Sequence, residues 1–216
     1  CSSATNLTIG RGLAEIGEGA FAYDSALRSI SIRGHVESIG ESAFGCCSSL
    51  TDLDWLQKDV RIGRGAFSSC NGLKSLVVPD TVASLGEDAF TYCEGLESVQ
   101  IGEGLDILAE GVFSGCSRLR DVDLGNKIRR IDGGAFARCY DLPTIEIPDS
   151  VTRVENGAFA YCIMLTNAAI GSGVTNIGAN AFGNSSNLNG VIIPKGVSCI
   201  VAGTFLYCTG LTSVVI

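Results

Sequence analysis

Basic residues, histidine and long apolar runs are scarce in this sequence of 216 residues. Lys and Arg number 15 against 23 Asp and Glu, which gives a formal net charge of −8 at pH 7. Because nucleic acids and anionic lipid surfaces are bound through basic faces, this balance disfavours both as partners. No apolar stretch is long enough to span a bilayer, so we expect no direct membrane insertion of this segment.

The residues and motifs of common active sites are also missing. His35 is the single histidine, and its place after an expected strand predicts a solvated turn residue. No Gly-x-Ser-x-Gly elbow, P-loop or His-Glu-x-x-His motif occurs. The Gly-rich stretches, such as 102–104, recur at a fixed phase and mark turns. We therefore expect no enzymatic activity, no cofactor and no metal site.

What the sequence does contain is a strict repeat. No Phe falls outside a 23-residue spacing. A Leu follows every Phe by six positions, and a small residue, usually Ala, precedes it. Such regular self-similarity is the signature of a repeat architecture. The nine Phe residues are Phe21, Phe44, Phe67, Phe90, Phe113, Phe136, Phe159, Phe182 and Phe205.

Each repeat predicts one turn of a solenoid. Two apolar residues follow each Phe by nine and eleven positions, as Val99 and Ile101 do, and this spacing places both on one face of a strand. A unit has about eight inward positions, too few to close a core alone, so successive units must stack. The short, Gly-rich segment before each Phe favours a 3₁₀ or single α turn. We expect a β-rich α/β solenoid with a parallel sheet and little helix.

The combined pattern resembles the BspA-like (Treponema pallidum type) leucine-rich repeat. The residues that carry the resemblance are Leu-x-x-Val-x-Ile, then Val-x-x-Ile-Gly, then Ala-Phe-x-x-Cys, and they cover the whole chain. The resemblance implies a right-handed leucine-rich-repeat solenoid with its strand sheet on the concave face. It also implies an extracellular or cell-surface protein that binds host proteins, matrix or other cells.

The domain organisation follows from the same repeat. Residues 1–216 form a single solenoid of about nine repeats of 23 residues. Neither end carries a polar capping repeat, and the sequence begins without Met, so we expect a segment of a longer chain or packing against further repeats or assembly subunits. The third coil is expected to be distorted, since Asp59 displaces a Val to Val60 and Trp55 fills an inward strand position.

Cysteine forms a column within the repeat. Seven of the ten Cys follow a Phe by three positions, and Cys1 has the same phase. A disulfide ladder and a metal site are the functional alternatives. Cβ atoms of stacked cysteines project in parallel, which disfavours disulfide bonds between coils. No CxxC pair is present, which disfavours a zinc site. We favour small apolar residues packed inside the solenoid. Asp24 and Ser185 take the same place in two coils.

The outward strand positions vary between repeats, so a ligand would be read there. Asp52 with Asp54, and Asp121 with Asp123, are expected on one face as an acidic strip that suits a basic or polyhydroxylated partner. The interpretation as a solvated face without a ligand stays open. The candidate ligand-binding residues on the concave face are Asp52, Asp54, Gln100, Arg120, Asp121, Asp123 and Glu146, and a possible apolar contact is formed by Ala169, Ile192 and Val215.

Two functions remain in competition. The first is a non-catalytic module that binds a protein or glycan partner through the concave face, for adhesion or ligand recognition. The second is a structural subunit or scaffold segment of a larger assembly, in which the ends and the apolar edge are packing surfaces.

Overall fold

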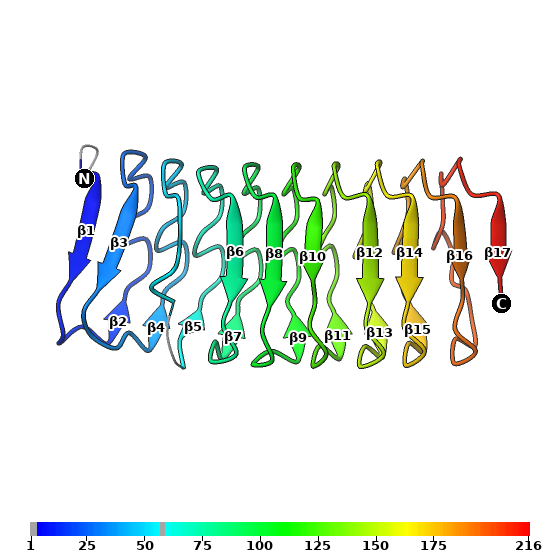
Figure 1. Ribbon diagram of the computed structural model, residues 1–216, viewed down its shortest axis with the longest axis horizontal. Helices are drawn as coiled ribbons and strands as arrows, with labels where there is room; N and C mark the ends of the chain where they lie inside the picture. Colours follow the sequence, from blue (N-terminus) through cyan, green and yellow to red (C-terminus); the bar gives the residue numbers. More distant parts are fainter. Residues whose placement is uncertain (1–3, 57–58) are drawn as a thin grey trace.

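The computed structural model describes residues 4–56 and 59–216, which form one continuous stack of coils (Figure 1). A typical coil contributes a long strand of three or four residues and then a short strand of two. The long strands are β1 (Asn6–Ile9), β3 (Ser29–Ile32), β6 (Ser75–Val78), β8 (Ser98–Ile101), β10 (Asp121–Asp123), β12 (Thr144–Ile147), β14 (Asn167–Ile170), β16 (Gly190–Ile192) and β17 (Ser213–Val215). The short strands are β2 (Glu15–Ile16), β4 (Ser38–Ile39), β5 (Arg61–Ile62), β7 (Ser84–Leu85), β9 (Ile107–Leu108), β11 (Arg130–Ile131), β13 (Arg153–Val154) and β15 (Asn176–Ile177).

All strand pairs are parallel, and each residue lies opposite its equivalent in the next coil. Leu76 pairs with Val99, for example, and Ile39 pairs with Ile62. Long strands form the sheets β1-β3, β6-β8-β10 and β12-β14-β16-β17, whereas short strands form β2-β4-β5-β7 and β9-β11-β13-β15. The predicted parallel-sheet solenoid is therefore confirmed. The short-strand sheets are an addition that the apolar spacing alone did not reveal.

The core is built from columns of identical residues. Phe rings stack along the solenoid with centroids 5.3–5.8 Å apart and interplanar angles of 1–22°. The seven inner Phe side chains are fully buried, and Phe21 and Phe205 at the two ends are partly buried. Because each ring is covered by those of its neighbours, a coil completes its core only by stacking.

The prediction of short α or 3₁₀ turns was wrong, because the described residues contain no helix of either kind. Around Phe44, three overlapping turns instead join Gly40 to Ala43, Ser42 to Gly45 and Phe44 to Cys47 through hydrogen bonds of 2.9–3.2 Å. Ser42 and Cys46 have φ of 52° and 62°, and a left-handed residue at the third position is typical of type II turns. Left-handed residues on both sides of each Phe stop a helix from propagating.

The third coil is distorted, as its sequence predicts. Residues 51–56 form no strand, which leaves a break in the long-strand sheet between β3 and β6. Trp55 is buried, and its ring lies 6.2 Å from that of Phe44 and 6.3 Å from that of Phe67. Val60 is buried one place after its expected position. The bulky indole therefore fills the core where a strand residue would otherwise point inward.

The cysteine column consists of buried free thiols, which confirms the interpretation as packed core residues. Each thiol donates a hydrogen bond to the carbonyl oxygen of the Phe in the preceding coil, as Cys93 does to Phe67 at 3.1 Å. Ser185 occupies the column with a buried hydroxyl, and Asp24 is also buried there. Cys1 lies outside the described residues.

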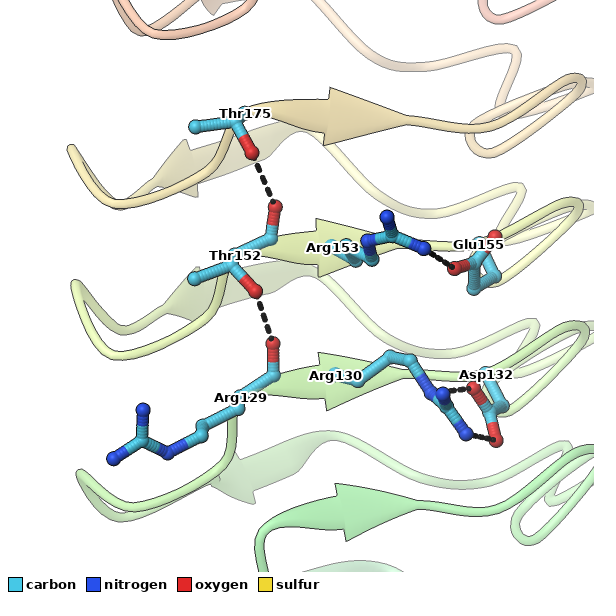
Figure 2. Close-up of polar contacts among 7 residues, drawn as sticks. All are labelled: Arg129, Arg130, Asp132, Thr152, Arg153, Glu155 and Thr175. Carbon is cyan, nitrogen blue, oxygen red and sulfur yellow. Dashed lines mark hydrogen bonds and ion pairs between the residues drawn. The ribbon is translucent and has the colours of Figure 1, made fainter.

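Polar side chains join the coils beside the short strands (Figure 2). Thr152 donates from Oγ1 to the carbonyl oxygen of Arg129 at 3.1 Å, and Thr175 donates to that of Thr152 at 3.2 Å. Arg130 Nε lies 2.6 Å from Asp132 Oδ1. These contacts satisfy loop carbonyls along the stack and place ion pairs on the short-strand side.

Candidate functional site

The outward face of the long strands, which we call the long-strand face, presents the residues that change from coil to coil. Alternation along each strand points the apolar residues inward and leaves the residues between them exposed, as in β12, where Ile145 is buried and Glu146 is exposed. In-register pairing then aligns equivalent outward residues across the sheet, so Glu146 lies beside Ala169.

The acidic part of this face is hollowed. A depression of about 570 Å³ crosses β10, β12 and β14, and its lining includes Asp121, Asp123 and Glu146. Asp123 Oδ1 accepts a 2.9 Å hydrogen bond from the main-chain nitrogen of Gly125. Because that bond anchors the carboxylate at the end of β10, the Asp123 charge has a fixed place on the rim of the depression.

Arg120 lines the same depression, but its charge is already paired. Its Nη2 donates to Asp141 Oδ2 at 2.9 Å. The remaining charged side chains of the depression are Asp121, Asp123, Glu146 and Asp149, all of them exposed carboxylates. The depression is therefore suited to cationic groups.

The apolar part of the face is a second depression of about 750 Å³ over β14, β16 and β17. Ile192 and Val215 keep 70% and 56% of their surface exposed, which is unusual for large aliphatic side chains on a sheet. Ala169 and Ile170 line both depressions, so the two adjoin. The structure thus joins the predicted apolar contact to the acidic strip.

The structure does not bring the whole predicted site together. Asp54 lines a separate depression of about 270 Å³ with Val77, and Asp52 is half-buried and accepts a hydrogen bond from Thr51 Oγ1 at 3.1 Å. Gln100 is exposed on β8, between the two regions. The break in the sheet at the third coil separates Asp52 and Asp54 from the rest.

Two exposed features escaped the sequence reasoning. Tyrosines follow Phe by two positions in four coils, with 44–76% of their surface exposed, and Arg138 lies 5.9 Å from the ring centroid of Tyr161. The recurrence of these tyrosines at one phase of the repeat was the sequence signal that could have identified them.

A depression of about 700 Å³ on the short-strand side is lined by Arg130 and several carboxylates, Asp132 among them. Within residues 4–56 and 59–216, no cluster of three or more His, Cys, Asp or Glu has a metal-binding arrangement.

Comparison with known families now identifies the repeat. A family model described as the BspA type leucine rich repeat region (6 copies) matches residues 1–97, 48–166 and 84–212. The chain belongs to this family. The spacing of the BspA-type repeat is thus confirmed as its organising feature, and leucine-rich repeats of this kind are typically non-enzymatic modules.

Solved structures agree with the BspA-type fold. The T. pallidum leucine-rich-repeat protein has 26% identity and a TM-score of 0.66, covering 72% of this chain and 73% of its own. A leucine-rich-repeat protein from Bacteroides ovatus has 26% identity and a TM-score of 0.60, covering 98% of this chain and 72% of its own. A leucine-rich cell surface protein from Faecalibacterium prausnitzii has 25% identity and a TM-score of 0.52, and the match covers 98% of this chain and 73% of that protein. No curated protein matches the chain. In the described part of the BspA-type chain, no helix is long and apolar enough to cross a bilayer.

Proposed function

We propose that this chain is a non-catalytic binding module that recognises a protein partner through the long-strand face. The observation that carries the proposal is that the acidic depression over β10 and β12 adjoins the exposed apolar patch over β16 and β17. Exposed aliphatic side chains beside fixed charges are typical of interaction surfaces. A face that served only for solubility would not need Ile192 and Val215 in outward positions.

Placement at the cell surface, for adhesion or ligand recognition, is part of the same proposal. It is supported by the F. prausnitzii relative, which is described as a cell surface protein. The column of buried thiols is compatible with an oxidising exterior, because burial shields the sulfur atoms from oxidants.

A scaffold segment of a larger assembly is the second candidate. It is favoured by Ile192, an outward-facing residue of β16 that keeps 70% of its surface exposed. In this function the apolar depression over β16 and β17 packs against assembly subunits, and the acidic depression binds no partner.

Affinity capture with a matched pair of variants distinguishes the two functions. The recognition variant carries Asp54→Lys, Asp123→Lys and Glu146→Lys, and the control carries Glu18→Lys, Glu103→Lys and Asp106→Lys, three exposed residues away from the long-strand depressions. The captured protein is then purified and its affinity measured for each chain. The binding function predicts loss of affinity only in the recognition variant. Equal affinity of all three chains for assembly subunits contradicts it and supports the scaffold.

A further inference from the structure

The two adjoining depressions of the long-strand face are together called the groove, which is defined by Asp121, Asp123, Glu146, Ala169, Ile192 and Val215. Its lining residues come from five successive long strands, β10, β12, β14, β16 and β17, which lie side by side along the solenoid (Figure 1). One end of the groove carries exposed carboxylates and the other carries exposed aliphatic side chains. Among the described residues that line the acidic end, Arg120 is the one cation, and it is paired with Asp141.

The strand spacing sets the distance between the two kinds of contact. Neighbouring paired strands lie about 4.8 Å apart, so Glu146 on β12 and Ile192 on β16, two strands away, are separated by about 10 Å across the sheet. Asp123 lies one coil further along, on β10, which ends the neighbouring sheet, so its distance from Ile192 is about 14 Å or somewhat more. An extended polypeptide rises about 3.4 Å per residue, and every second side chain faces the same way. Its residues i, i+2 and i+4 therefore fall at about 0, 7 and 14 Å along the groove.

This correspondence selects the chemistry of the occupant. Residue i lies over Asp123, residue i+2 lies within reach of Glu146, and residue i+4 lies over Ile192. Cationic side chains match the first two positions and an aliphatic one matches the third. A neutral glycan offers no cation for the carboxylates. A second copy of this chain, with its net charge of −8, would bring further negative charge to the acidic end.

We infer that the groove binds an extended polypeptide segment lying across the strands, with basic residues at i and i+2 and an aliphatic residue at i+4. The inference rests on the proposed binding function and names the class of partner. The basic residues contact the carboxylates of β10 and β12, and the aliphatic side chain covers Ile192 and Val215. The paired, in-register strands β12, β14, β16 and β17 keep Glu146, Ile192 and Val215 at constant separation, so this part of the motif is read by its spacing.

Synthetic peptides test the spacing directly. One contains Lys-Ser-Lys-Ser-Leu between glycines, a second has the reverse order, and a third has the same composition with the two Lys and the Leu adjacent. Fluorescence anisotropy at low and physiological salt measures their affinities. Of the two spaced peptides, we expect the one that binds more tightly to have about tenfold higher affinity than the adjacent peptide. Replacing its Leu with Ser is expected to lower that affinity about tenfold. Equal affinity of the spaced and adjacent peptides, or binding by neither order, overturns the inference.

Variants of the chain locate the binding. Glu146→Gln and Ile192→Ser change exposed groove residues, so the fold is expected to tolerate both. Glu18→Gln and Val77→Ser are the controls, since Val77 is 60% exposed on the long-strand face but outside the groove. Each groove variant is expected to weaken the spaced peptide about fivefold to tenfold, and each control to leave it unchanged. Unchanged affinity in both groove variants overturns the inference.

Failure of the inference is distinguishable from failure of the proposed function. If no peptide binds while the triple recognition variant still loses its captured partner, the spacing is wrong and the long-strand face remains the binding surface. If the triple variant also keeps its partner, both are wrong. Sedimentation equilibrium adds a further check, because a dimer that Ile192→Ser dissociates would identify a second copy as the occupant and overturn the inference.

Discussion

Ser185 donates a 3.2 Å hydrogen bond from its hydroxyl to the carbonyl oxygen of Phe159, which lies in the preceding coil. In seven other coils a thiol makes the equivalent bond at 3.0–3.4 Å, as between Cys116 and Phe90. In these eight coils the position holds a small, buried donor, which is either a thiol or a hydroxyl. The column of donors joins successive coils through the core.

The first prediction concerns the donor at Cys116. Cys116→Ser keeps a donor of the kind that Ser185 supplies, whereas Cys116→Ala removes it and leaves a small cavity. We expect Cys116→Ala to lower the free energy of unfolding by about 1–2 kcal/mol and Cys116→Ser to lower it less. Urea unfolding followed by circular dichroism measures both. A serine variant less stable than the alanine variant would contradict the role of the hydrogen bond.

The second prediction concerns alkaline pH. Desolvation by burial raises the pKa of Cys93 and Cys162 from the ordinary 9.0 to about 12. The folded state then keeps thiol protons that the unfolded chain loses, so stability is fully present below pH 9 and falls as pH rises from 9 towards 12. Each such thiol contributes a loss of up to about 1.4 kcal/mol per pH unit in that window.

Urea midpoints at pH 8, 9, 10 and 10.5 test this dependence. Cys93→Ser provides the control, because it removes one buried titrating group while retaining a hydroxyl donor. We expect a shallower decline for the variant than for the parent. Parallel declines would show that the thiol at position 93 does not control alkaline stability.

The third prediction concerns the Phe column. The ring of Phe113 lies between those of Phe90 and Phe136, at centroid distances of 5.8 and 5.4 Å, and is fully buried. Phe113→Ala is expected to cost about 3–5 kcal/mol in unfolding free energy. Phe205→Ala is the matched control, since within the described part of the chain Phe205 stacks on one ring, that of Phe182, and is partly buried. An equal loss for both variants would indicate that stacking on two sides is not what stabilises the column.

The repeating core was predictable because its period is set by packing. Phe113 and Leu119 recur at one phase, since each must meet its equivalent in the next coil. The turns were not predictable in the same way. Tyr92 and Arg138 have φ of 55° and 62°, and neither residue type signals a left-handed backbone. Main-chain hydrogen bonds between coils impose that conformation. The main-chain N–H of Tyr92, for example, donates to the carbonyl oxygen of Ser114 at 2.7 Å.

The candidate site was predictable only in part, for a related reason. Outward positions follow from alternation, so Asp123, Glu146 and Ile192 could be assigned to one face. The separation of Asp54 from them depends on how Trp55 fits between Phe44 and Phe67, and a linear pattern does not contain that geometry. The pairing of Arg120 with Asp141 likewise joins residues whose contact only the fold creates.

Site-specific photo-crosslinking tests the binding face most directly. A photoreactive amino acid is placed at Thr144 or Asn167, two exposed positions that line the groove without contributing its charges, and at Asn176, exposed on the short strand β15. With the captured partner bound, the account predicts crosslinks from positions 144 and 167 and none from 176. Crosslinking from 176 alone would place the partner on the short-strand side and contradict recognition through the long-strand face.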